Sequence, residues 1–158
     1  MLFQVDFSHL EIDEGMKFKR PIHILLVEDN RADARLVEEA LKDSKRPCEL
    51  SVVDDGDRAL AFLQARAPYG ERRLPDLILL DLNLPARDGR EVLREIKADP
   101  DLRRIPVVVL TTSDAERDIV EAYSHHANCY VSKPVDFDRF MELIQSICHF
   151  WFDIVCLP

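Results

Sequence analysis

Short apolar runs separated by more polar segments recur along the chain. The pattern predicts five strands, at about Ile22–Val27, Cys48–Val53, Leu77–Asp81, Pro106–Thr111 and Ala127–Ser132. Runs this apolar, bounded by polar breaks, are typical of strands that are buried on both faces of a parallel sheet. The second run differs, because Leu50 and Val52 alternate with Glu49 and Ser51, and this alternation favours an edge strand.

A helix is predicted after each of these strands. The predicted helices begin near Asn30, Asp57, Arg90, Ala115 and Asp136, and Asn30 is a suitable N-cap residue. Strand followed by helix, repeated five times, implies right-handed crossovers and an α/β fold with one parallel sheet.

The last helix carries more apolar residues than packing on a sheet requires. One stripe should pack on the sheet and consists of Phe137, Phe140, Met141, Ile144, Cys148 and Trp151. A second stripe continues into an apolar tail, and together they predict an interface formed by Leu143, Ile147, Phe150, Trp151, Phe152 and Ile154. Burial of this surface against a partner is the favoured interpretation, and folding of the tail onto its own domain is the alternative.

Composition narrows the class of protein. The 158 residues suggest one domain, which we expect to span 21–150 between an N-terminal extension at 1–20 and an apolar tail at 151–158. A net charge of −9 and a pI of about 5.0 argue against a nucleic-acid partner. No apolar run reaches the roughly 20 residues that span a bilayer. Four cysteines without a CxxC pair indicate a reducing compartment, so we expect a cytoplasmic protein.

Charged and hydroxyl side chains follow the predicted strands. The first predicted strand is followed by Glu28 and Asp29, and the third ends in Asp81. The fourth ends in Thr111, and the fifth is followed by Lys133. Polar groups at the carboxyl ends of parallel strands gather at one edge, where open α/β sheets bind ligands. Three neighbouring carboxylates require a cation or protonation, and Mg²⁺ prefers such oxygen ligands. Each residue alone also has a structural explanation, such as a helix N-terminal anion for Asp29.

The same positions resemble the motifs of a response-regulator receiver domain. The motifs are Leu25–Asn30, Asp76–Pro85 followed by Asp88-Gly89, Pro106–Thr111, and Ser132-Lys133-Pro134. Their order and spacing match the family from about Ile22 to Ile147. The resemblance implies a flavodoxin-like, doubly wound, five-stranded parallel sheet in the order 2-1-3-4-5, with helices on both faces.

The resemblance also implies a role for the acidic residues. Asp81 would be the phosphoacceptor, and it would receive the phosphoryl group from a sensor histidine kinase in the presence of Mg²⁺. Asp29 would bind the metal directly, Glu28 mainly through water, and Asn83 through its backbone carbonyl.

Four further positions carry the remaining family roles. Thr111 and Lys133 would contact the phosphoryl group, and Tyr130 matches the aromatic switch position. The Lys133-Pro134 peptide bond would be cis, as is usual in the family. Thr112 departs from the family pattern, in which Ala or Gly commonly follows the switch hydroxyl, and we expect its bulkier side chain to restrict approach to the phosphoryl group on Asp81 and so to affect its lifetime.

Part of the sequence is similar to the small single-domain regulators that serve phytochrome-type photoreceptor kinases. The similar segments are 81–85, 88–93, 109–113, the loop 67–75 and the aromatic tail. This resemblance implies a bacteriophytochrome as the kinase. The apolar surface of the last helix and tail indicates a homodimer. Phosphorylation of Asp81 is expected to change the surface of the fourth helix, fifth strand and fifth helix, through which output would pass.

Two other functions fit parts of the pattern. Aspartyl phosphatases of the haloacid dehalogenase type also use a strand-end Asp, but their general-acid position is occupied here by Asn83, which cannot donate a proton in that way. A phosphorylation-independent adaptor would not require the complete set of Asp81, Thr111 and Lys133. We therefore expect a phosphoryl acceptor that is not an enzyme, apart from loss of its own phosphoryl group.

Overall fold

The structure is a computed structural model that describes residues 3–6, 20–66, 68–70 and 73–158. The strands are β1 (Phe3–Asp6), β2 (Ile22–Val27), β3 (Cys48–Val53), β4 (Leu77–Leu80), β5 (Val107–Thr111) and β6 (Cys129–Ser132). The helices are α1 (Arg31–Lys42), α2 (Gly56–Leu63), α3 (Gly89–Ala98), α4 (Glu116–Ser124) and α5 (Phe137–Cys148), and a π-helix, η1, follows at His149–Ile154. The predicted extension at 1–20 and loop at 67–75 lie partly outside the described residues.

The sheet has the strand order β1-β3-β2-β4-β5-β6. The last five strands in this order are parallel, which confirms the predicted order 2-1-3-4-5 for the repeated strand–helix units. The strand β1 pairs antiparallel with β3, so the prediction that Cys48–Val53 forms the edge of the sheet is wrong.

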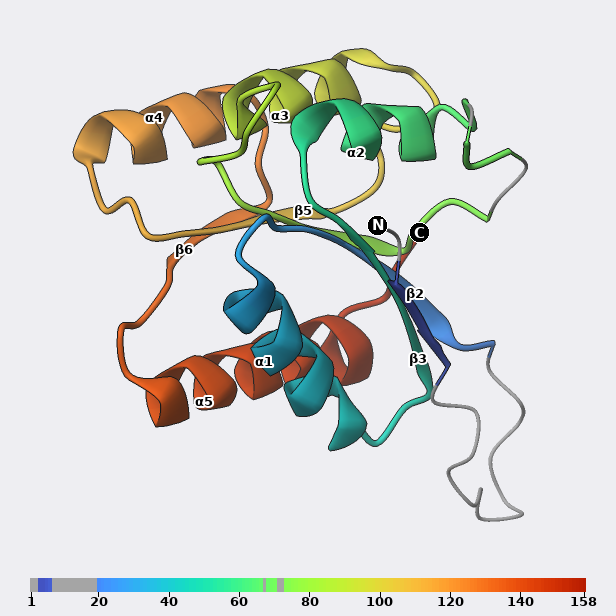
Figure 1. The fold of residues 1–158 in the computed structure, drawn as a ribbon, viewed down its shortest axis with the longest axis vertical. Helices are drawn as coiled ribbons and strands as arrows, with labels where there is room; N and C mark the ends of the chain where they lie inside the picture. Colours follow the sequence, from blue (N-terminus) through green and yellow to red (C-terminus); the bar gives the residue numbers. More distant parts are fainter. Residues whose placement is uncertain (1–2, 7–19, 67, 71–72) are drawn as a thin grey trace.

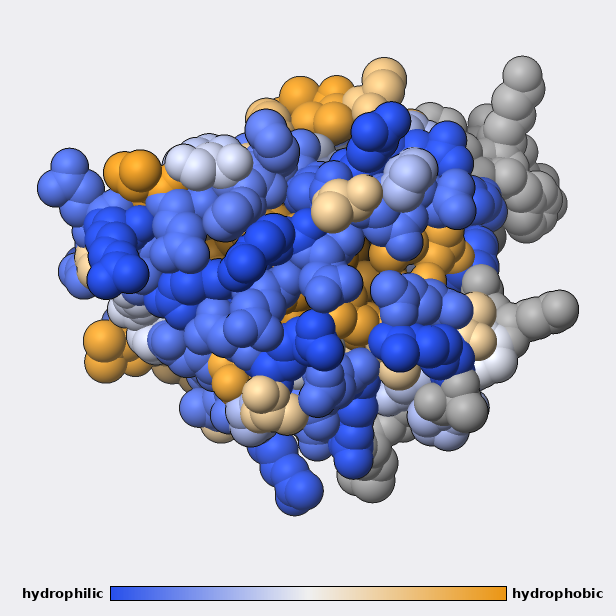
Figure 2. All heavy atoms as spheres, turned by 90° about the horizontal axis from the view of Figure 1, so that it is seen from above, coloured by the Kyte–Doolittle hydropathy of each residue, from blue (hydrophilic) through white to orange (hydrophobic). Residues whose placement is uncertain are grey.

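Helices cover the sheet on both faces (Figure 1). The helices α1 and α5 pack on one face, and α2, α3 and α4 pack on the other. Alternate residues of β2 serve the two cores, because Leu25 and Val27 face α2 and α3 while Ile24 and Leu26 face α1 and α5. This two-sided burial explains why the strands read as continuous apolar runs. The outer surface of α2, α3 and α4 is mostly hydrophilic (Figure 2).

The strand register brings the polar strand ends together. Val27 of β2 pairs with Leu80 of β4, so the residues that follow them, Glu28 and Asp81, leave the sheet side by side. Thr111 of β5 pairs with Ser132 of β6, directly before Lys133. The backbone continues this pairing for one more residue, since the Asp81 amide donates to the Val27 carbonyl at 3.0 Å.

The C-terminal segment packs on its own domain more completely than predicted. Ile147, Trp151 and Phe152 are buried, with 7%, 8% and 3% of their surface exposed, in the core between α1, α5 and the sheet. The prediction that these three side chains are covered by a partner is therefore wrong. Trp151 and Phe152 follow Ile147 and Cys148 by four residues, so the helical turn that continues beyond α5 carries them to the same buried face.

The other predicted interface residues behave differently. Phe150 and Ile154 are 49% and 60% exposed, and Leu143 is half-buried. Phe137, which was predicted to pack on the sheet, is 59% exposed. The segment is held by a bond from the Arg46 guanidinium to the Phe152 carbonyl at 2.7 Å. A genuine apolar surface therefore remains, but it is smaller than the sequence suggested.

The cysteines are unpaired, and two of them are buried. All four cysteines lie in the described residues and are free thiols, and burial raises the pKa of Cys48 to about 11 and that of Cys148 to about 12. A search of the described residues for a helix of the length and apolarity needed to cross a membrane finds none.

Candidate phosphoacceptor and metal site

The loop between β2 and α1 fixes the first two acidic residues. Asn30 caps α1, and its side-chain oxygen accepts bonds from the backbone amides of Ala32 and Asp33 at 2.9 and 3.1 Å. The Asn30 amide in turn donates to the Glu28 carboxylate at 3.0 Å. Glu28 is thereby held in a buried position, whereas Asp29 is exposed. The positive end of the α1 dipole faces this pair of carboxylates.

Asp81 follows β4 and has defined partners on both of its oxygens. Its Oδ1 accepts bonds from the Asn83 amide at 3.0 Å and from the Thr111 hydroxyl at 2.9 Å. Its Oδ2 accepts from Lys133 Nζ at 3.0 Å. Asp81 is buried, with 6% of its surface exposed, and its orientation is set by groups at the ends of β4, β5 and β6.

Three carboxylates meet at this edge of the sheet. Glu28, Asp29 and Asp81 each offer one oxygen, and these oxygens lie within 4.8 Å of one another. Oxygen-only ligand sets of this kind suit hard divalent cations, and one face of the group is open through the exposed Asp29. The donor set therefore fits a divalent metal ion, as the sequence predicted.

Lys133 supplies the positive charge at the centre of the site. Its Nζ donates to the Glu28 carboxylate and lies 3.0 Å from Asp81 Oδ2 and 3.0 Å from Asp33 Oδ2. The sequence reasoning missed Asp33. Asp33 lies in the first turn of α1, after the N-cap Asn30, and no local pattern links it to Lys133, which is 100 residues away in the sequence.

Burial and crowding shift the pKa values in this pocket. Burial raises the pKa of Glu28 to about 7, although the hydrogen bond from Lys133 opposes the shift. Burial alone would lower the pKa of Lys133, but the hydrogen bond and charge of Glu28, followed by the charge of Asp81, raise it above its ordinary value. Lys133 therefore stays charged, while Glu28 takes up a proton at a higher pH than an ordinary glutamate does.

The Asp88-Gly89 motif has a steric explanation. A Cβ atom on Gly89 would lie 2.2 Å from the Asp81 carbonyl oxygen and 2.6 Å from the Leu82 Cα. Asp88 caps α3 by accepting from the Arg90 amide at 2.8 Å. Glycine therefore allows the first turn of α3 to press directly on the backbone that carries Asp81.

Hydrogen bonds extend from the site toward α4 and β6. The Tyr130 hydroxyl donates to the Ser113 carbonyl at 2.8 Å, two residues after Thr111. The Ser113 hydroxyl donates to Asp118, which forms a 2.7 Å ion pair with Arg90. Tyr130 is thus tied to the loop that begins at Thr111. The cis geometry of the Lys133-Pro134 bond stays a prediction.

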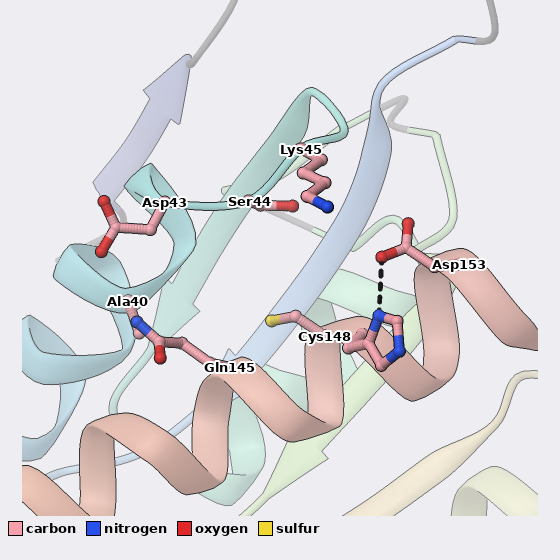
Figure 3. Close-up of a pocket in the computed structure, with 8 residues that line it drawn as sticks. Ala40, Asp43, Ser44, Lys45, Gln145, Cys148 and Asp153 are labelled. Carbon is pink, nitrogen blue, oxygen red and sulfur yellow. Dashed lines mark hydrogen bonds and ion pairs between the residues drawn. The ribbon is translucent and has the colours of Figure 1, made fainter.

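A separate hollow lies on the α1–α5 side of the molecule. It has a volume of about 130 Å³ and opens between the end of α1, the loop after it, and α5 with η1 (Figure 3). A hydrogen bond of 3.0 Å joins His149 Nδ1 and Asp153 Oδ2 on its rim. Since none of the predicted site residues lines it, the function is assigned to the carboxylate cluster instead.

Comparison with known proteins shows the family of the chain. A family model described as the response regulator receiver domain matches residues 24–145. Response regulator Rcp1 of Synechocystis sp. is 53% identical over 87% of this chain and 94% of its own length. A probable methanogenesis regulatory protein, FilR2 of Methanothrix harundinacea, is 41% identical over 90% of this chain and 91% of its own length.

The chain is also similar to solved structures of response regulators. The Mn²⁺-bound form of Rcp1 matches with a TM-score of 0.85 and 53% identity over 87% of this chain and 99% of that one. The phosphorylated cyanobacterial phytochrome response regulator RcpA matches with a TM-score of 0.86 and 50% identity over 88% of this chain and 99% of that one. The fold, the strand-end cluster and these similarities agree, and the chain belongs to the response regulator receiver domain family.

Proposed function

We propose that Asp81 accepts a phosphoryl group from the phosphohistidine of a sensor histidine kinase. An Asp81 carboxylate oxygen would attack phosphorus as the phosphorus–nitrogen bond breaks, and the imidazole would leave with the electron pair. The observation that carries the proposal is the meeting of Asp81 with Lys133, Thr111 and two further carboxylates at one sheet edge. We propose Mg²⁺ as the divalent ion, held by Glu28 and Asp29, by Asp81, and by the backbone carbonyl of Asn83.

Several groups around Asp81 would stabilise the phosphoryl group during this transfer. Lys133 and Thr111 already donate to the two oxygens of Asp81, so they would continue onto the phosphoryl oxygens as the new bond forms. Bound Mg²⁺ would neutralise charge that develops on those oxygens. The same groups would permit slow loss of the phosphoryl group to water, at a rate that depends on the access that Thr112 leaves.

The kinase is proposed to be of the phytochrome type. RcpA is a cyanobacterial phytochrome response regulator, and the bacteriophytochrome response regulator AtBRR is 41% identical over 84% of this chain with a TM-score of 0.67. Similarity at this level over nearly a whole domain supports a shared class of phosphodonor. We also infer a cytoplasmic location, which the four free thiols support.

Output is proposed to pass through Thr111 and Tyr130. Thr111 contacts Asp81 at one end of a short loop, and the Tyr130 hydroxyl binds the Ser113 carbonyl in the same loop. A change at Asp81 can therefore alter the position of α4, where Val120 and Tyr123 are 58% and 49% exposed. Moving a population from 1:99 to 99:1 takes about 5.5 kcal/mol, and two or three charge-assisted bonds to the phosphoryl group could supply it.

A second copy of the chain is the proposed partner of the C-terminal segment. Phe150 and Ile154 are four residues apart on one side of η1, and both are largely exposed. Replacing both with lysine should lower the apparent mass in sedimentation, whereas lysine at Leu74, an exposed apolar residue elsewhere, should not. A wild-type protein that sediments as a monomer, with and without phosphodonor, would contradict the dimer.

Labelling by a small acyl phosphate tests the central proposal. The wild-type protein should take up one phosphoryl group in the presence of Mg²⁺ and lose it slowly. Asp81→Asn should not be labelled, whereas Asp114→Asn, which removes an exposed carboxylate outside the site, should be labelled normally. Continuous turnover would indicate an aspartyl phosphatase, and no labelling of the wild type would indicate an adaptor.

A further inference from the structure

Lys133 has more anionic partners than the proposed transfer requires. Its Nζ contacts carboxylates of Glu28, Asp33 and Asp81, which come from the loop after β2, from α1 and from the end of β4. An ammonium group has three N–H bonds to donate. These three carboxylates can occupy all of them, so a phosphoryl oxygen can gain a bond from Lys133 only when one contact is given up.

The three contacts differ in how readily they can be released. The side chains of Glu28 and Asp81 are 2% and 8% exposed, whereas that of Asp33 is 24% exposed. Water can replace the Lys133 contact at Asp33 more easily than at the buried carboxylates. The backbone of Asp33 is fixed by its bond to the Asn30 cap, so the carboxylate stays within reach of Lys133. Asp33 is thus the partner best placed to hold Lys133 and to release it.

We propose that Asp33 is a positioning residue that competes with the phosphoryl group on Asp81 for Lys133; this inference rests on the proposed phosphoacceptor role of Asp81. A phosphorylated side chain carries roughly −1.5 to −2 charges, and Asp33 places another anion on the same ammonium group. Removing the Asp33 charge weakens its bond to one N–H of Lys133, because a neutral acceptor competes less well than a carboxylate, and it removes a repulsion. The phosphorylated state therefore gains stability when the charge of Asp33 is lost.

The same charge acts oppositely on the metal ion. Asp33 adds negative potential beside the cluster of Glu28, Asp29 and Asp81, and it partly neutralises Lys133, which would otherwise repel a divalent cation. Removing the charge should therefore weaken Mg²⁺ binding to the unphosphorylated protein. Opposite effects on Mg²⁺ and on a phosphoryl group distinguish competition for Lys133 from general damage to the site.

Titration calorimetry on Asp33→Asn tests the proposal with two probes. The first is Mg²⁺ alone, and the second is beryllofluoride, an analogue of the phosphoryl group, at saturating Mg²⁺. Asp33→Asn should weaken Mg²⁺ binding by about threefold and tighten beryllofluoride binding by roughly tenfold, the gain expected from one charge-assisted bond. Glu38→Gln is the matched control, because it removes one carboxylate from the same helix without touching Lys133, and it should change neither affinity by more than about twofold.

Each outcome bears on a different claim. Weaker binding of both probes by Asp33→Asn, or no change in either, would refute the competition while leaving the role of Asp81 intact. The same opposite shifts in Glu38→Gln would also refute it, since they would reflect net charge rather than contact with Lys133. Failure of the wild-type protein to bind beryllofluoride would instead refute the proposed function, and this inference with it. Circular dichroism of both variants would verify that each remains folded.

Discussion

Replacing Lys133 with methionine would leave the acidic pocket without its buried cation. Only 3% of the Lys133 side chain is exposed, and its Nζ contacts three carboxylates, two of which are themselves buried. Removing one partner from a buried ion pair costs about 3–5 kcal/mol, because the remaining charge is left uncompensated. For a chain of this size, that loss lowers the melting temperature by roughly 6–20 °C.

The stability that Lys133→Met loses should depend on pH and on a bound divalent metal ion, each in a defined direction. Without Lys133, the pKa of Glu28 rises above its value of about 7, so the folded state binds protons that the unfolded state, at an ordinary pKa of 4.5, has released. The stability gap between variant and wild type therefore narrows as the pH falls from 8 to 6 and widens as it rises. A divalent cation at 100 times its dissociation constant adds about 2.7 kcal/mol and should offset much of the loss at pH 8.

Urea unfolding followed by circular dichroism measures these differences, and Lys97 provides the control. Lys97 Nζ donates to the Arg103 and Ile105 carbonyls and to the Asn128 side chain, all of them uncharged. Lys97→Met should cost about 1–3 kcal/mol, with no dependence on Mg²⁺. If Lys133→Met lost only as much stability as Lys97→Met, and if that loss did not change with Mg²⁺ or between pH 6 and 8, the idea that Lys133 acts by neutralising carboxylates would be refuted.

Three further predictions follow from the same structure. Affinity for Mg²⁺ should rise between pH 6 and 8, because Glu28 must lose its proton to bind; calorimetry would measure it, and a flat profile would argue against Glu28 near the metal. Trp151→Ala should cost about 3–5 kcal/mol in chemical unfolding and Phe150→Ala under about 1 kcal/mol, and equal losses would contradict their assigned burial. Gly89→Ala should cost about 1–3 kcal/mol and slow the labelling of Asp81, because its Cβ meets the Asp81 carbonyl; an unchanged variant would contradict that contact.

The elements that could be predicted from the sequence are those whose pattern repeats. Both faces of β2, β4 and β5 are covered by helices, so their residues are apolar without interruption and easy to recognise. The N-caps Asn30, Asp88 and Asp136 mark the starts of three helices through side-chain bonds. Once the strands were assigned, parallel topology alone brought Asp81 and Lys133 to one edge.

The elements that were missed depend on contacts that no local pattern encodes. The strand β1 is only four residues long, so the alternation of Phe3 and Val5 with Gln4 and Asp6 is a weak signal without the antiparallel partner β3. Trp151 lies on the stripe predicted to pack on the sheet, whereas Phe152 reaches the same core because the helical turn continues past Cys148 as η1, which the apolar tail does not indicate. Asp33 is an ordinary acidic residue in a first helical turn until Lys133, 100 residues later, is folded against it.

An imbalance of charge connects the stability of this pocket with its function. Four carboxylates, those of Glu28, Asp29, Asp33 and Asp81, share the one ammonium group of Lys133. The pocket partly relieves the excess by favouring a proton on Glu28, which costs stability as the pH rises. A divalent cation removes the same excess more completely, and a phosphoryl group then restores negative charge, which the cation, Lys133 and Thr111 would stabilise. The divalent cation and the phosphoryl group therefore each change which contacts of Lys133 and Thr111 are most favourable. The resulting difference in free energy between the two sets of contacts is what drives a conformational switch.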